Sequence, residues 1–114
     1  MNDTEDKCDR LIRSLNGEIV SFSVSERAQL PNLPDRRYRL RSTAFWWEVK
    51  GPKDKLSQGQ LDFLTAEYRC GQIVGAGDAE ALLALVTQRA SDWRSLGYTA
   101  LATVLARGIR KQAA

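Results

Sequence analysis

The segment spanning residues 45–52, Phe-Trp-Trp-Glu-Val-Lys-Gly-Pro, constrains this chain more than any other. It places Glu48 and Lys50 two residues apart at the end of an apolar run, and such residues point to the same face of a β-strand. A strand this apolar belongs in a core, where structure alone gives little reason for two charges on one face. We therefore expect Glu48 and Lys50 to be functional, with a simple surface ion pair as the alternative.

The composition limits the chemistry that the chain can perform. With 114 residues it is expected to form a single domain, residues 1–114, and it has no histidine and two cysteines, Cys8 and Cys70, read as free thiols. A zinc site, a Ser-His-Asp triad and a histidine general base are therefore not expected. Any bound metal should have oxygen ligands, which points to Mg²⁺ or Mn²⁺.

The same composition bears on localisation. No apolar run approaches the roughly 20 residues of a membrane-spanning helix. Residues 1–15 mix acids, bases and apolar residues, unlike a signal peptide. We expect an intracellular, cytoplasmic chain with no membrane partner.

Basic residues gather between positions 36 and 55, where only Glu48 and Asp54 oppose them, although the net charge of the chain is only +3. A focused basic region suits binding to a polyanion such as DNA, and a solvated basic face is the alternative. The candidate DNA-binding residues in this region are Arg36, Arg37, Arg39, Arg41, Lys53 and Lys55.

Hydrophobic periodicity predicts the element order α-β-β-β-α-β-α-α, an α/β fold with a mixed sheet flanked by helices. Thr4, Ser57 and Asp78 are the expected helix N-caps. The expected helices cover residues 5–15, 58–69, 79–89 and 98–111, and the expected strands cover residues 18–24, 37–41, 44–50 and 72–76. Residues 25–34 are expected to be a loop, and the last helix is either core or a dimer interface.

The pairing of the second and third strands decides which acids meet. A two-residue turn at residues 42–43 would place Arg37 opposite Glu48 and Asp35 opposite Lys50. Asp35, Glu48 and Lys50 would then share one face of the sheet. A slip of one residue would turn Asp35 to the core side, so the expectation depends on the register.

Two acids and a lysine on one face suit a metal-dependent phosphodiesterase. Asp35 and Glu48 would hold a cation that polarises a phosphoryl oxygen and lowers the pKa of bound water, and the carbonyl of Val49 could add a ligand. Lys50 would lie against that water or the phosphate. Glu5 could reach the metal from the first helix, although the helix dipole alone also favours an acid there.

Three blocks of sequence together resemble the PD-(D/E)XK nuclease superfamily, most of all its virus-type replication-repair nuclease branch (VRR-NUC). They are Pro34-Asp35, Glu48-Val49-Lys50-Gly51-Pro52 and Lys55-Leu56-Ser57-x-x-Gln60. The resemblance covers about residues 5–88 and leaves residues 91–114 as a C-terminal helical extension. It implies a restriction-endonuclease-like core and Mg²⁺- or Mn²⁺-dependent hydrolysis of DNA, with no nucleotide cofactor. Small stand-alone members from phages and bacteria are associated with homodimers and with branched DNA such as four-way junctions.

The resemblance also implies roles for single residues. Asp35 and Glu48 would be metal ligands, Lys50 the catalytic lysine, Gln60 the helix glutamine and Glu5 the acid of the first helix. Gln60 has an equally good explanation in the capping-box spacing that begins at Ser57.

One departure from the family pattern keeps a second function open. Arg36 and Arg37 follow Asp35, where a hydrophobic strand is usual, and an arginine there could either displace a metal or clamp a phosphate. The alternative is a nuclease fold that binds DNA or a protein without cutting, as a phage regulator or anti-defence factor. Arg37 and Arg39 would then dominate the binding face.

Overall fold

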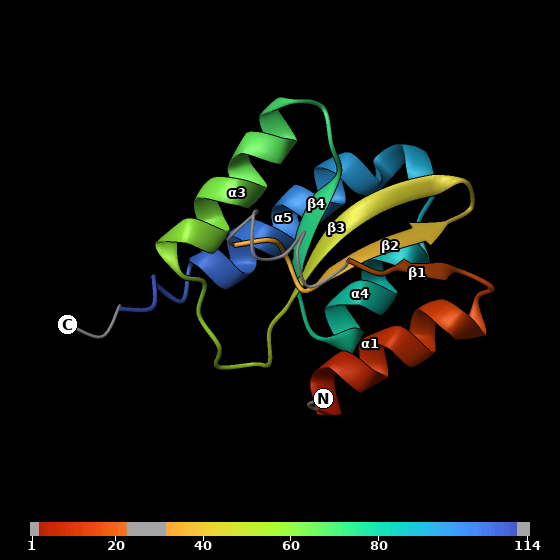
Figure 1. Cartoon of the computed structure of the whole chain (residues 1–114), viewed down its shortest axis with the longest axis horizontal. Helices are drawn as coiled ribbons and strands as arrows, with labels where there is room; N and C mark the ends of the chain where they lie inside the picture. The colour runs from red at the N-terminus through yellow and green to blue at the C-terminus, as the bar shows by residue number, and fades with distance from the viewer. Residues whose placement is uncertain (1–2, 23–31, 112–114) are drawn as a thin grey trace.

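The computed structural model describes residues 3–22 and 32–111 as an α/β fold (Figure 1). The elements, in order, are α1 (Asp3–Ser14), β1 (Glu18–Val20), β2 (Arg36–Leu40), β3 (Thr43–Val49), α3 (Gln58–Arg69), β4 (Val74–Gly77), α4 (Ala79–Val86), the short 3₁₀ helix η1 (Ala90–Asp92) and α5 (Trp93–Leu105). Within these described residues, the predicted order of helices and strands is confirmed, and the short helix η1 is an addition to it. None of the helices in the described residues is long and apolar enough to cross a membrane.

The sheet has the order β1-β2-β3-β4, antiparallel in its first two pairs and parallel between β3 and β4. Helices flank it on both faces (Figure 1). On one face, Phe45 and Trp47 of β3 share a core with residues of α1 and α4. On the other, Trp46 packs in a core with residues of α3 and α5. β3 lies between β2 and β4, and both of its faces are covered. It is therefore a buried strand, as its apolar sequence predicts.

The turn between β2 and β3 begins one residue earlier than predicted. Arg41 and Ser42 both have positive φ angles, 53° and 61°, as a type I′ hairpin turn requires. Arg37 therefore lies opposite Trp46, and its predicted position opposite Glu48 is wrong. The pairing is displaced by two residues in total, and side chains alternate with a period of two, so every residue keeps its predicted face.

Several predicted ends are also wrong. Thr4 lies inside α1, which already begins at Asp3, so it is not the N-cap. The strand predicted over residues 18–24 ends at Val20, and most of the predicted loop 25–34 falls in residues 23–31, outside the described part. The fourth strand and the helix after it are each displaced or shortened by a few residues.

The last helix differs most from its prediction. It begins at Trp93, whose ring lies in the core, and it ends at Leu105 rather than continuing to residue 111. Beyond it the chain turns at Gly108, with a φ of 99°, and Ile109 forms a parallel bridge with Leu56. Pairing with a distant segment thus replaces the last predicted helical turns.

Two glycines allow α5 to approach β4 closely. A Cβ atom on Gly97 would lie 2.2 Å from the carbonyl oxygen of Val74, and one on Gly75 would lie 2.5 Å from the ring of Trp47 and 3.5 Å from the Cα atom of Gly97. Backbone and a packed indole cannot give way easily. The position of α5 therefore depends on the absence of side chains here.

We expect Gly97→Ala to destabilise the protein by about 2 kcal/mol or more, because the new methyl group overpacks the contact between helix and strand. Ser95→Ala, exposed on the same helix, is the control and should change the free energy of unfolding by less than about 0.5 kcal/mol. Urea unfolding of both variants measures the difference. Equal stability of the two would contradict the close approach.

Candidate active site

Glu48 and Lys50 lie at the end of the central strand, where both are buried. Their exposed fractions are 1% and 6%, which is rare for charged residues. Lys50 follows the last residue of β3, and its backbone N–H donates to the carbonyl of Gly77 at 3.0 Å. The β-ladder therefore fixes the backbone that carries both side chains.

Asp35 immediately precedes β2 and lies beside Glu48. The last pair of the hairpin is Arg36 with Trp47, so the next position along each strand brings Asp35 and Glu48 together. The backbone N–H of Val49 donates to Asp35 Oδ2 at 3.1 Å, which holds the carboxyl group against β3. The predicted sharing of a face by Asp35, Glu48 and Lys50 is thus found, although the register differs.

Burial, the largest cause, and the neighbouring Asp35 carboxyl together raise the pKa of Glu48 to about 9. The charge of Lys50 acts in the opposite direction and limits this increase in pKa. Glu48 Oε2 is buried with no hydrogen-bond partner in the structure. In this environment Glu48 holds a proton at neutral pH unless another positive charge replaces it.

Gln60, in the first turn of α3, forms the predicted helix cap and also contacts Glu48. Its side-chain Oε1 accepts a hydrogen bond from the backbone N–H of Ser57 at 2.9 Å. Its backbone N–H donates to Ser57 Oγ at 3.1 Å, and the two bonds form a complete capping box. Because Gln60 Oε1 is used in this way, the amide nitrogen Nε2 of the same side chain points to Glu48. It donates to Glu48 Oε1 at 3.2 Å. The helix cap therefore orients the side chain that holds Glu48.

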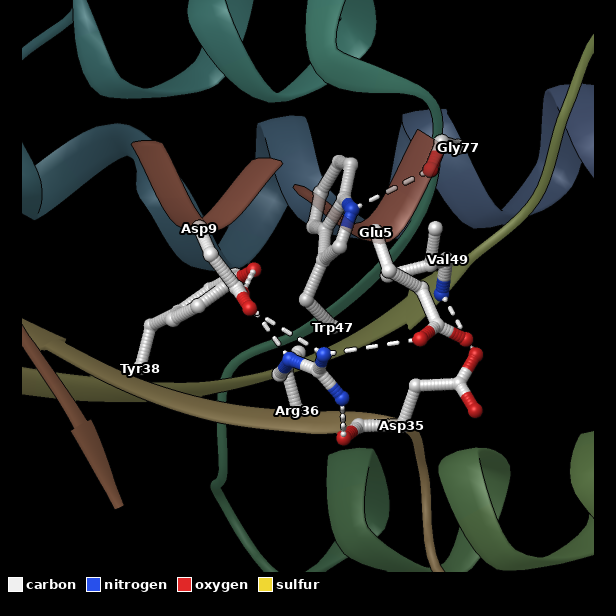
Figure 2. A network of polar contacts seen from close by, with 8 residues as sticks. All are labelled: Glu5, Asp9, Asp35, Arg36, Tyr38, Trp47, Val49 and Gly77. Carbon is white, nitrogen blue, oxygen red and sulfur yellow. Dashed lines mark hydrogen bonds and ion pairs between the residues drawn. The ribbon is translucent and has the colours of Figure 1, made fainter. Parts of the chain in front are cut away.

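The side chain of Arg36 lies on the face of the sheet opposite to Glu48. There it belongs to a network of hydrogen bonds and ion pairs with residues of α1 (Figure 2). Its Nε and Nη2 donate to the two carboxylate oxygens of Asp9 at 2.8 and 3.1 Å, and Nη1 donates to the backbone carbonyl of Asp35 at 2.9 Å. The hydroxyl of Tyr38 donates to Asp9 at 2.7 Å. Burial raises the pKa of Asp9, but the hydrogen bonds from Arg36 and Tyr38 outweigh it and hold that pKa below its usual value.

Sequence reasoning does not predict this network. Asp9 is four residues after Glu5 and adjoins the apolar stripe of α1. This position was the only sequence signal that Asp9 is buried. Its partner Arg36 lies 27 residues away. The network joins α1 to Asp35 of the candidate site, because the guanidinium group that binds Asp9 also donates to the backbone carbonyl of Asp35.

Glu5 does not complete a metal-binding set of three carboxylates. Its carboxylate lies 3.5 Å from Arg36 Nη2, and Figure 2 shows it turned toward the Arg36 and Asp35 end of the network. In the described residues, no group of three or more Asp, Glu, Cys or His side chains is arranged to hold a metal ion. The N–H of Val49 donates to Asp35, and the role of the Val49 carbonyl as a metal ligand stays a prediction.

The other candidate basic residues are distributed over several surfaces. Arg37 lies over the Trp46 ring at 4.6 Å and donates to Gln72, and its Nη1 is buried with no partner in the structure. Arg39 pairs with Glu18 at 2.9 Å, and Arg41 donates to the carbonyl of Gln88. Lys53 and Lys55 are exposed on the loop after Lys50. The candidates therefore do not form one continuous surface.

The raised pKa of Glu48 predicts how stability depends on pH. In the unfolded chain the group ionises near its ordinary pKa of 4.5, whereas in the native protein it keeps its proton to about 9. Between these values the native state binds more protons, so the free energy of unfolding falls as pH rises. Glu48→Gln removes this dependence and should stabilise the metal-free protein on the order of 2 kcal/mol near neutral pH.

Urea unfolding at several pH values with a chelator present tests this expectation. The exposed Glu80→Gln variant is the matched control, and its profile should follow that of the wild type. Parallel profiles for Glu48→Gln and the wild type would show that Glu48 is not protonated in the native state.

Comparison of the chain with family models, with curated proteins and with solved structures found no match.

Proposed function

We propose that the protein is a metal-dependent nuclease that hydrolyses DNA phosphodiester bonds, on a restriction-endonuclease-like form of the α/β fold. The observation that carries this proposal is the buried Glu48, which has one carboxylate oxygen without a partner and lies beside Asp35 and Lys50. A buried carboxylate without a compensating charge is costly. A divalent cation is the partner that such an oxygen and its acidic neighbour suit best.

The available donors fit a hard cation such as Mg²⁺ or Mn²⁺. Magnesium is commonly bound by one or two carboxylates together with waters and substrate phosphates, so Asp35 and Glu48 suffice as protein ligands. When bound, such an ion polarises the phosphoryl oxygen and lowers the pKa of water. Because Glu48 must lose its proton first, the affinity for the ion should rise with pH.

The remaining residues position the reacting groups. The N–H of Val49 holds Asp35, and the amide of Gln60 holds Glu48 while leaving Oε2 available. Lys50 contributes a cation close enough to lower the pKa of Glu48. From there its ammonium group is suited to bind phosphate oxygens and to offset charge that develops in the transition state.

The substrate and the assembly are extensions of this proposal. Exposed Lys53 and Lys55 next to the site favour a polyanionic substrate. The motif likeness to VRR-NUC nucleases favours branched DNA, including four-way junctions, and a homodimer that could act on two strands. Arg36 and Arg37 are not proposed as DNA contacts, because α1 and Trp46 engage them.

A second candidate is a nuclease-fold protein that binds DNA or a protein without cutting. The absence of a three-residue metal group from the described residues favours it. Cleavage in the presence of Mg²⁺ or Mn²⁺ separates the two candidates.

We expect the wild type to cut DNA with Mg²⁺ or Mn²⁺ and not with a chelator, and Glu48→Gln and Lys50→Met to abolish cutting. Both variants should remain folded, because each replaces a buried ionisable side chain with a neutral one of similar size. A panel of linear, flapped and four-way DNA measures activity, and circular dichroism measures folding. Unchanged cutting by both variants would refute the proposal.

The two functions of Gln60 can be separated by a pair of variants. Ser57→Ala removes the cap oxygen and should cost about 1 kcal/mol of stability while cleavage continues. Gln60→Ala removes the cap and the hydrogen bond to Glu48, so it should also lower metal affinity or activity by about 10–100-fold. Calorimetric metal titration and initial cleavage rates compare the two. Equal activity in both variants would mean that Gln60 acts as a cap alone.

A further inference from the structure

Two segments far apart in the sequence lie side by side next to the candidate site. They are the loop of residues 51–56, between β3 and α3, and residues 107–111, after α5 (Figure 1). Leu56 and Ile109 form a parallel bridge, and the N–H of Arg110 donates to the carbonyl of Leu56 at 2.7 Å. We call the surface that they share the tail–loop surface.

Arg107 fixes this arrangement. Its Nη1 donates to the carbonyls of Gly51 and Asp54, at 2.8 and 2.9 Å. Within the loop, Asp54 Oδ2 accepts from the N–H of Gly51 at 2.8 Å. Gly51 directly follows Lys50, so the brace holds the chain at the point where it leaves the candidate site.

The tail–loop surface is strongly basic. Its one acid in these two segments is Asp54, and its basic residues are Lys53, Lys55, Arg107, Arg110 and Lys111. Except for Arg107 these cations are exposed, and none of the four exposed ones forms an ion pair within residues 3–22 and 32–111. Several unpaired cations held on a fixed backbone form a surface suited to a polyanion.

We propose that the tail–loop surface binds the phosphate backbone of duplex DNA and leads it to the face of Glu48 and Lys50. The choice of DNA as the ligand, and its path toward Glu48 and Lys50, rest on the proposed function. DNA is favoured over an anionic membrane because stable attachment to a membrane takes a second, apolar contribution besides basic residues. The exposed large apolar residues of the described chain, Leu15, Leu83, Leu96 and Tyr98, lie outside these segments.

The test removes one cation from each segment. Lys55→Gln with Arg110→Gln is compared with Arg69→Gln and Arg89→Gln, two exposed residues elsewhere. Both double variants lower the net charge by the same amount, so a difference between them reports position rather than total charge. Thermal unfolding confirms that each variant is folded.

Binding of a fluorescent DNA duplex is measured by anisotropy at several salt concentrations, with a chelator present. The Lys55 and Arg110 variant should bind more weakly and reduce the slope of log Kd against log salt by about 2, because each phosphate that is no longer neutralised lowers it by about 1. The control should keep the wild-type slope. Equal weakening in both variants would overturn the proposal, as would wild-type binding to phosphatidylserine vesicles but not to DNA.

Cleavage with Mg²⁺ or Mn²⁺, measured separately, distinguishes failure of this inference from failure of the nuclease proposal. Position-dependent binding without any cleavage would support the tail–loop surface and reject the nuclease. Cleavage by the Lys55 and Arg110 variant with unchanged affinity and salt slope would support the nuclease and reject the surface.

Discussion

The burial of Glu48 beside Asp35 is the interaction on which the other features of the site depend. Two carboxyl groups in a covered sheet cannot both be ionised without a compensating charge. The chain supplies part of this compensation with the charge of Lys50 and the amide of Gln60, and a proton on Glu48 supplies more. One carboxylate oxygen still has no partner. Retaining such a group is easiest to explain if its task is to bind a cation.

Hydrogen bonds from several elements of the fold hold Asp35, Glu48 and the chain around them in place. Arg36 ties the start of β2 to α1, and the capping box of α3 aims Gln60 at Glu48. Arg107 holds the loop that follows Lys50. Each brace joins the site to a different element, so the positions of the functional groups depend on the packing of the whole sheet with its helices.

Sequence reasoning succeeded where the signals are local or insensitive to small shifts. The alternation of side chains along a strand placed Glu48 and Lys50 on one face, and an even shift of register left that result unchanged. The cap formed by Ser57 and Gln60 needs only four adjacent residues. The turn was missed because Arg41 and Ser42 are not residues that usually signal positive φ angles. The contacts of Arg36 with Asp9 and of Arg107 with Gly51 span 27 and 56 residues, and one sequence carries no signal for such pairs.

A crystal structure with Mn²⁺ would test whether Asp35 and Glu48 together bind a divalent cation. Anomalous scattering would locate the ion independently of the protein atoms around it. We expect a peak within bonding distance of Glu48 Oε2 and the Asp35 carboxylate. The absence of such a peak, with the ammonium group of Lys50 bound to Glu48 Oε2 instead, would contradict this expectation.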